Sequence, residues 1–272
     1  MNVLEKIVVA LQTTAEHPTN FGVYHLCCVA AVIIITVLMC IFLRKINDKT
    51  FRIIVGSLWI VMVLFEIYKQ VVFNYNADTG WGYDWAYFPY QLCSTPMYVL
   101  PILAFFKDGK IRDAAIFYIA TFSFFGGLVV YIFPNDVFNT NLLGIHIQTM
   151  VHHGIQVILG IYVPVYYLKK YSWKNYFLAS AFFGVLLLIA LALNCIVGPR
   201  VDNAFNMFYI GPYHACHLPI LSAIYPKVPF VVFFLIYGVG FCVAALVLYV
   251  IPWGIKKLVD LIKGKKANKQ NA

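Results

Sequence analysis

Charged residues are scarce in this sequence. Asp, Glu, Lys and Arg together make up 11% of its 272 residues, whereas a soluble domain carries roughly 25%. Hydrophobic residues make up 62% instead, and the mean hydropathy is +0.81. This composition excludes a soluble globular protein and indicates an integral membrane protein with a single helical domain.

Several other features are missing as well. The seven cysteines form no CxxC pattern, so no disulfide framework is expected, and most of them lie within apolar runs as small fillers. No internal repeat and no low-complexity linker is visible. Residues 1–20 are too polar to contain the apolar region of a signal peptide, so we expect a short amphipathic segment there.

Long apolar runs dominate what the sequence does have. Seven runs of about twenty residues match the length of a helix that crosses a bilayer. They cover residues 21–43, 53–73, 87–106, 114–133, 147–168, 176–197 and 230–251. The expected fold class is therefore all-α: a polytopic transmembrane helical bundle of about seven spans. It divides into a lead-in at 1–20, a transmembrane domain at 21–251 and a basic tail at 252–272.

The basic residues are unevenly placed. Most follow the first, third, fifth and seventh runs: Arg44, Lys45, Lys49, Arg52, Lys107, Lys110, Arg112, Lys169, Lys170, Lys174 and six lysines of the tail. The alternate segments hold only Lys6, Arg200 and Lys227. By the positive-inside rule, the N-terminus is expected outside and the C-terminus in the cytoplasm of a multi-pass cell-membrane protein. This distribution, rather than the net charge of +9, argues against a nucleic-acid partner.

The run at 87–106 is unusual for a membrane span. It contains three prolines and a cysteine, Cys93, with the polar neighbours Gln91, Ser94 and Thr95. Pro96 has no N–H to donate and crowds the preceding turn, so we expect a helix kinked beside Cys93. Such a break must face protein or a water-filled cavity, because lipid cannot satisfy the freed carbonyl.

Two further runs carry polar groups. In the fifth run, Thr149, His153 and Gln156 follow helical spacing and form one polar stripe, while His152 points about 100° away. In the second run, Glu66 and Lys69 lie one turn apart near the outer boundary. Glu66 is either part of a functional site or half of an ion pair at the interface.

Cysteine and histidine together are the minimum for an activated thiol nucleophile. A metal-dependent hydrolase is an alternative, in which His214 and His217 flank Cys216 and are joined by His152 or His153. A non-catalytic solute transporter is a second alternative, because broken helices suit transporters.

A family resemblance adds to these patterns. The segment FPYQLCSTPMYVLPI at 88–102, the step His153–Gly154, and Asn194 followed by NMF at 206–208 resemble the YwaF family of bacterial integral membrane proteins, which is related to transmembrane protein 164. That protein is an acyltransferase acting on lysophospholipid with a cysteine as proposed acyl carrier. The resemblance implies Cys93 as acyl nucleophile and His153 as its base. Many family members carry a histidine where this chain has Gln91.

From these features we expect acyl transfer or ester hydrolysis on a membrane phospholipid or fatty-acyl ester. Cys93 would attack the acyl carbonyl, and His153 would take and return the proton. Gln91, Asn194 and Asn206 are the expected groups for holding the substrate or the oxyanion. Glu66 is assigned to the same pocket, and neither a cofactor nor a bound metal is expected.

Overall fold

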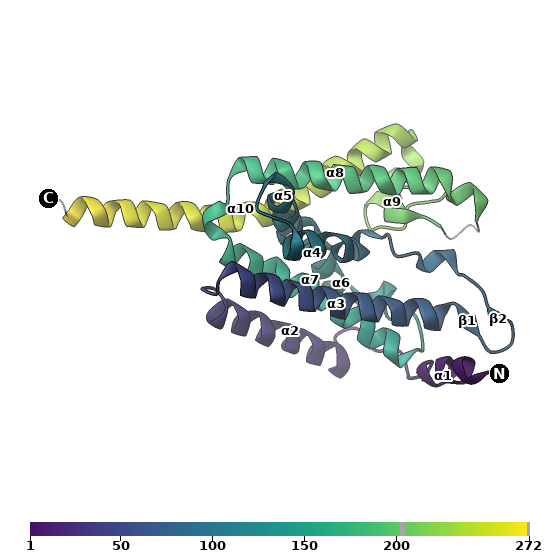
Figure 1. Ribbon diagram of the computed structural model, residues 1–272. Helices are drawn as coiled ribbons and strands as arrows, with labels where there is room; N and C mark the ends of the chain where they lie inside the picture. Colours follow the sequence, from purple (N-terminus) through teal and green to yellow (C-terminus); the bar gives the residue numbers. More distant parts are fainter. Residues whose placement is uncertain (202–204, 271–272) are drawn as a thin grey trace.

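The computed structural model describes residues 1–201 and 205–270 as a bundle of roughly parallel and antiparallel helices (Figure 1). Two short strands, β1 (Tyr75–Asn76) and β2 (Gly80–Trp81), form an antiparallel hairpin. Short helical turns connect the longer elements: η1 (Trp85–Tyr87), η2 (Leu92–Ser94), η4 (Pro134–Asp136), η5 (Leu168–Lys170), η6 (Gly198–Arg200), η7 (Met207–Tyr209) and η8 (Tyr225–Lys227). The expectation of an all-α class is therefore confirmed in its main feature.

Five helical segments of the described residues are long and apolar enough to cross a bilayer. They are α2 (Val23–Phe42), α3 (Asp48–Phe73), the continuous run of α5 (Lys110–Tyr118), η3 (Ile119–Ser123) and α6 (Phe124–Ile132), then α8 (Trp173–Ile196) and α10 (Phe230–Gln270). The segment η3 is a π-helix. These five correspond to five of the seven expected spans, so the count of seven is not confirmed.

The expected span at 87–106 is not one helix. The chain makes the turn η2, and α4 (Pro96–Phe105) then begins at Pro96, with Pro101 inside it. Pro96 therefore starts a helix rather than kinking one, since the first turn of a helix does not use the missing N–H. Ten residues rise about 15 Å, half the hydrocarbon thickness of a bilayer.

The expected span at 147–168 corresponds to α7 (Leu143–Tyr166), a helix of 24 residues. It packs against α2, α3, α6 and η3, and most of its residues are buried. Because protein rather than lipid surrounds it, this helix can carry polar side chains that a lipid-facing helix could not. The centre of the bundle is therefore where the polar residues of the sequence gather.

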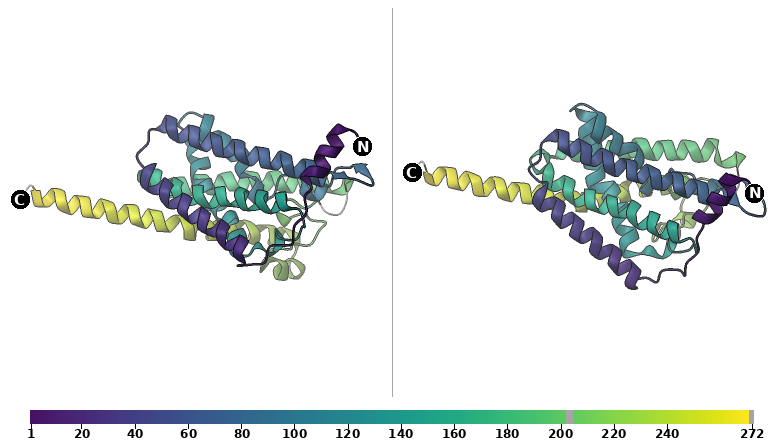
Figure 2. Two further views of the ribbon diagram at one scale, coloured as in Figure 1. Left: turned by 90° about the horizontal axis from the view of Figure 1, so that it is seen from below. Right: turned by 60° about the horizontal axis from the view of Figure 1, so that its bottom comes forward.

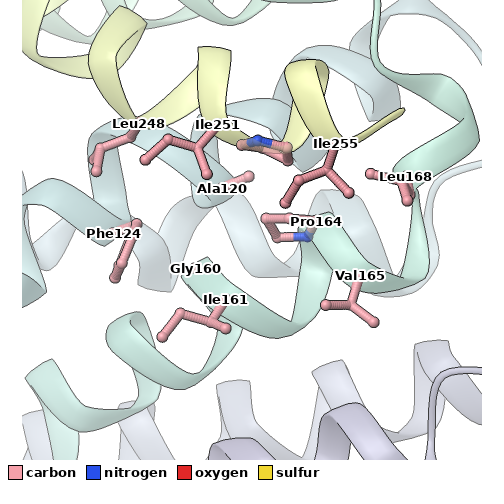
Figure 3. A pocket seen from close by; sticks show the side chains of 11 residues that line it. Ala120, Phe124, Gly160, Ile161, Pro164, Val165, Leu168, Leu248, Ile251 and Ile255 are labelled. Atoms are coloured by element: carbon pink, nitrogen blue, oxygen red, sulfur yellow. The ribbon is translucent and has the colours of Figure 1, made fainter. Parts of the chain in front are cut away.

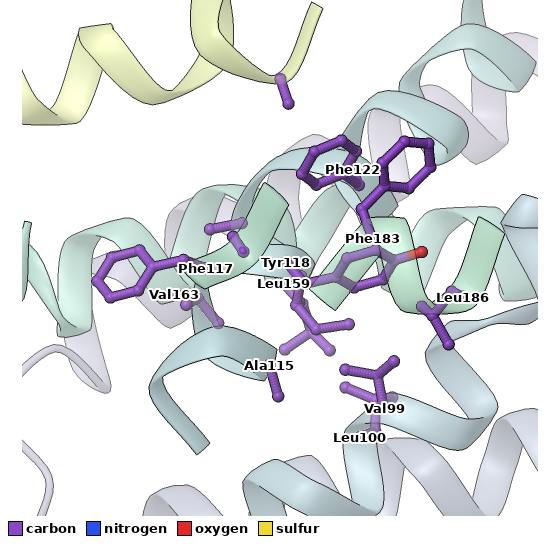
Figure 4. Packing of buried hydrophobic residues seen from close by; sticks show 14 of the residues in the cluster. Val99, Leu100, Ala115, Phe117, Tyr118, Phe122, Leu159, Val163, Phe183 and Leu186 are labelled. Carbon is purple, nitrogen blue, oxygen red and sulfur yellow. The ribbon is translucent and has the colours of Figure 1, made fainter. Parts of the chain in front are cut away.

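The apolar core surrounds α7 and α4. Side chains from α4, α5, α7 and α8 meet there, among them Leu100, Tyr118, Leu159 and Phe183 (Figure 4). Phe122 stacks on Phe183 with ring centroids 4.4 Å apart. This packing fixes how α4 and α7 face each other.

An ion-pair network centred on a buried arginine joins the helices at one end of the bundle. Arg112 on α5 is 1% exposed, and its Nη2 lies 2.8 Å from Asp48 Oδ1 and 3.0 Å from the hydroxyl of Tyr167. Asp108 also pairs with Arg112. These contacts join the ends of α3, α5 and α7, where the sequence expects the cytoplasmic side.

The two chain ends lie at opposite ends of the bundle. Helix α1 (Val3–Leu11), the β1–β2 hairpin and α9 (Leu221–Ile224) occupy one end, and α10 extends far beyond the other helices at the opposite end (Figures 1 and 2). The tail predicted at 252–272 is thus a continuation of α10 as far as Gln270. Residues 271–272, and the side chains from 265 onward, lie outside what the structure describes.

Candidate functional site

The main chain of Cys93 is held by two side chains of α7. The carbonyl oxygen of Cys93, in η2, accepts a hydrogen bond from His152 Nε2 at 2.9 Å and one from Gln156 Nε2 at 3.0 Å. His152 and Gln156 are four residues apart and therefore lie on one face of the helix. The structure thus joins the cysteine segment to α7 through the main chain.

His153, the expected base, lies on the next face of α7. Its Nδ1 is 2.7 Å from the carbonyl oxygen of Thr149, one turn earlier. A carbonyl can only accept, so Nδ1 carries the proton and Nε2 keeps its lone pair. Within the described residues, the buried Nε2 has no hydrogen-bond partner. The structure thus places Nε2 of His153 inside the bundle with no hydrogen bond to the described residues.

Polar residues of α3 complete the cluster from the other side. Lys69 Nζ is 2.8 Å from Glu66 Oε1, and Gln70 Nε2 donates to the same oxygen at 2.7 Å. The expected ion pair of Glu66 with Lys69 is present. It is largely buried, since Glu66 is 7% exposed. Lys69 also lies within electrostatic range of Cys93, His152 and His153.

Four buried atoms of this cluster have no hydrogen-bond partner in the part of the chain that the structure describes. They are Glu66 Oε2, His152 Nδ1, His153 Nε2 and Gln156 Oε1. Each is an acceptor, because the other nitrogen of each histidine and the amide nitrogen of Gln156 act as the donors. A buried polar group without a partner costs roughly 1–3 kcal/mol. The cluster is therefore suited to a group that brings hydrogen-bond donors, such as a hydroxyl, an amine or water.

Glycine lets the neighbouring helix come close to α7 at this level. A Cβ on Gly127 of α6 would lie 2.7 Å from Gln156 Cβ and 2.9 Å from the carbonyl oxygen of His153. No side chain at this position fits without moving one of the helices. The close approach of α6 thus fixes the height and rotation of His153 and Gln156 in the bundle.

The three amide residues expected at the site are all bonded to one loop. Gln91 donates from Nε2 to the carbonyl of Asn206 at 2.9 Å and accepts from the N–H of Phe208 at 2.8 Å. Asn194 makes the same kind of pair with the main chain of Met207, at 2.9 Å and 2.7 Å. Asn206 accepts from the N–H of Gly211 at 2.7 Å.

These bonds explain the shape of the loop. Phe208 and Tyr209 have positive φ values of 56° and 55°, a conformation that costs about 1–3 kcal/mol per non-glycine residue unless the surroundings hold it. Phe205, Met207 and Phe208 are buried, so the segment at 205–211 folds into the end of the bundle beside Cys93's neighbour Gln91. The hydrogen bonds of Gln91, Asn194 and Asn206 to its main chain hold the loop in this conformation.

Residues 214–217 do not show the grouping of ligands that the metal-dependent hydrolase alternative requires. Cys216 is buried, and burial raises the pKa of its thiol. His217 is exposed and makes an edge contact with Tyr209, with ring centroids 6.3 Å apart. Across the described ranges, no three or more His, Cys, Asp or Glu side chains are grouped so that they could hold a metal ion.

An apolar groove is present further along α7, toward its C-terminal end. This groove of about 280 Å³ lies between α7, α10 and the η3–α6 run (Figure 3). Gly160, Ile161 and Pro164 of α7 form its floor, and Phe124 and Ile251 form its walls. A groove lined in this way accommodates hydrocarbon and offers nothing to a polar group.

The sequence did not identify His152 as part of the site, and it grouped Gln156 with His153 rather than with His152. The available signal was the spacing of four residues between His152 and Gln156, which places them on one face as surely as Thr149 and His153 share another. The sequence predicts Lys69 only as the partner of Glu66 in an ion pair at the interface, and it assigns no role to Gln70. Their partners on η2 and α7 come from distant parts of the chain, so no local pattern reveals them.

Comparison with known proteins gives one match. The model of the TMEM164 family matches residues 15–249. This supports the resemblance to transmembrane protein 164, and the YwaF name receives no separate support. No curated protein matches the chain, and no solved structure does either.

Proposed function

The chain belongs to the TMEM164 family of membrane proteins, and from this membership and the geometry of the site we propose that it is a lipid acyltransferase or ester hydrolase. Its substrates are the acyl chains of membrane phospholipids or fatty-acyl esters. Cys93 is the nucleophile and His153 is the general base. The carrying observation is the buried Nε2 of His153, which has no hydrogen-bond partner among the described residues and lies one residue after the histidine that holds Cys93.

The reaction has two halves. His153 Nε2 takes the proton of the Cys93 thiol, and the sulfur attacks the ester carbonyl. The carbon–oxygen ester bond then breaks, the departing alcohol takes the proton back from His153, and the acyl group remains on sulfur as a thioester. In the second half, a hydroxyl acceptor or water gives its proton to His153, attacks the thioester, and the thiol leaves and is reprotonated.

His152 and Gln156 are positioning residues in this account. Their two bonds to the Cys93 carbonyl fix the turn that carries the thiol. A nucleophile that is already fixed in a reactive geometry loses less conformational entropy on reaching the transition state, and the activation free energy is lower. Glu66, with its unpaired Oε2, is the group that receives a donor from the substrate.

The amides act on the site through the loop. Gln91, Asn194 and Asn206 hold residues 205–211 against the cysteine segment. We assign them to forming the pocket wall. Each amide uses its oxygen and one N–H on the main chain of residues 206–215, which holds the amide plane in place.

In the membrane, we propose that α7 makes one further pass and that the chain through η2 and the short helix α4 together makes another, for seven in all. The broken pass of α4 is buried in protein, the condition under which a bilayer tolerates irregular backbone. The lysine and arginine bias then gives an outer N-terminus and a cytoplasmic C-terminus in the cell membrane. The direct test of the activity is capture of a labelled acyl chain on Cys93, described at the end of the Discussion.

A further inference from the structure

Helix α10 is longer than a bilayer is thick. Its 41 residues extend about 60 Å, about twice the hydrocarbon thickness of a membrane. The apolar stretch ends near Ile251, and the rest projects away from all the other helices (Figures 1 and 2). At its start, Ile255 lines the groove beside Pro164, and Lys256 Nζ donates to the carbonyl of Tyr171 at 2.8 Å, whereas Leu258, Leu261 and Ile262 beyond them are exposed.

The projecting helix is nonetheless amphipathic. Ile255, Leu258, Leu261 and Ile262 are 50%, 58%, 64% and 49% exposed. At about 100° per residue they share one side, while Lys256, Asp260 and Lys263 share the opposite side. Such an apolar side is expensive to leave in water. Its three lysines, counting Lys257, against one aspartate give the polar side a positive charge.

The segment leaves the bundle at a point suited to a membrane boundary. Trp253 stacks near Trp173, with ring centroids 5.2 Å apart, and Lys257 Nζ lies 5.7 Å from the Trp253 ring. Tryptophan and lysine are enriched where a helix meets the headgroups. Pro252 cannot donate to the carbonyl of Leu248, so the helix can bend there at low cost.

We propose that residues 255–263 are an interfacial helix that binds the anionic surface of the bilayer from which α10 emerges. In this arrangement the helix bends near Pro252, which releases Lys256 from the carbonyl of Tyr171, and lies along the membrane. Its isoleucine and leucine side enters the acyl boundary, and its lysines contact anionic headgroups. The sequence adds Lys265, Lys266 and Lys269 to the same segment. The occupant of the apolar side is therefore lipid, and the proposal does not depend on the enzymatic activity.

The test uses full-length protein in which the seven native cysteines are replaced. A single reporter cysteine is placed at Leu258 or, as the matched control, at Asp260, which points nearly opposite. Each is labelled with a polarity-sensitive fluorophore and reconstituted in phosphatidylcholine vesicles, with or without phosphatidylglycerol. Iodide is present on both sides of the membrane. In anionic vesicles, iodide should quench the label at Leu258 several-fold less than the label at Asp260, and a lipid-borne quencher should show the reverse order.

Two further variants keep the proposal falsifiable. Replacing Lys256, Lys257, Lys263, Lys265, Lys266 and Lys269 by Gln should remove the difference between neutral and anionic vesicles. Ile255→Gln with Ile262→Gln should expose the Leu258 label to iodide. Equal iodide quenching at both positions in anionic vesicles would overturn the proposal. Protection of Leu258 that is independent of phosphatidylglycerol and grows with the protein-to-lipid ratio would also overturn it, because it would indicate contact between copies of the chain.

Discussion

His152 Nε2 donates a hydrogen bond to the main-chain carbonyl of Cys93 across 2.9 Å. This bond ties the centre of α7 to the turn that precedes α4, between residues far apart in the sequence. Gln156 makes the second bond to the same oxygen at 3.0 Å. The cysteine is therefore held by its backbone at two points on one face of α7.

Removing His152 should loosen this turn. We expect His152→Ala to lower kcat roughly fivefold, the effect of one net hydrogen bond of about 1 kcal/mol, while KM changes little. His152→Gln keeps a donor and should recover part of the loss. Steady-state kinetics of both variants provide the check, and a His152→Ala enzyme with unchanged kcat would contradict the positioning role.

Mutation can distinguish the role of His153 from that of Thr149, which lies one turn earlier on the same face of α7. His153→Ala should slow acylation by about 10²- to 10⁴-fold, as for loss of a general base. Thr149→Ala should remain near the wild-type rate, because the bond that sets the His153 tautomer goes to the main-chain carbonyl of Thr149. Single-turnover acylation rates test both variants. A Thr149→Ala enzyme as slow as His153→Ala would point to the threonine hydroxyl as the reacting group.

The loop at 205–211 should depend on Asn194. Asn194→Ala removes two bonds to Met207 and leaves buried main-chain groups unpaired, so we expect a loss of about 1–3 kcal/mol in the free energy of unfolding. Cys195→Ser, at the exposed next position, is the control and should be neutral. Thermal unfolding in detergent gives the comparison. If Asn194→Ala keeps the wild-type Tm and instead raises KM, the residue binds substrate directly.

The membrane orientation can be tested with introduced cysteines in a cysteine-free background. Reporters at Ala77 and Asn139 are exposed at one end of the bundle, and reporters at Lys45 and Lys110 are exposed at the other. An impermeant maleimide should label the first pair in intact cells and reach the second only after lysis, as the basic residues indicate. The reverse pattern would place the C-terminus outside.

The sequence predicted most of the long helices, because a segment that crosses lipid must be apolar, about twenty residues long and internally hydrogen-bonded. The runs at 21–43, 53–73 and 176–197 end within a few residues of α2, α3 and α8, except that α3 starts earlier, at Asp48. Asn47 explains this start, since its side chain accepts from the N–H of Thr50 and caps the helix. The prediction of one spanning helix at 87–106 was wrong, because apolar composition alone cannot distinguish a full span from a turn followed by a short helix.

The site was predictable in its residue types more than in its contacts. A cysteine beside proline and a histidine on a buried helix are visible in the sequence. Which of the adjacent residues His152 and His153 faces Cys93 depends on the rotation of α7, which Gly127 sets from α6. The partners of Gln91, Asn194 and Asn206 are main-chain atoms of a loop, and no side-chain pattern encodes them.

The most direct measurement is acyl capture by the purified protein. The enzyme is incubated with a phospholipid that carries a labelled acyl chain, and label on the protein is measured before and after neutral hydroxylamine, which cleaves thioesters. We expect hydroxylamine-sensitive label on the wild type, and none on Cys93→Ser, since an oxygen ester resists this treatment and serine is a far weaker nucleophile at neutral pH. Cys216→Ser, the matched control at a buried cysteine, should label like the wild type. Hydroxylamine-sensitive label that persists on Cys93→Ser would contradict the assignment of Cys93 as the acyl carrier.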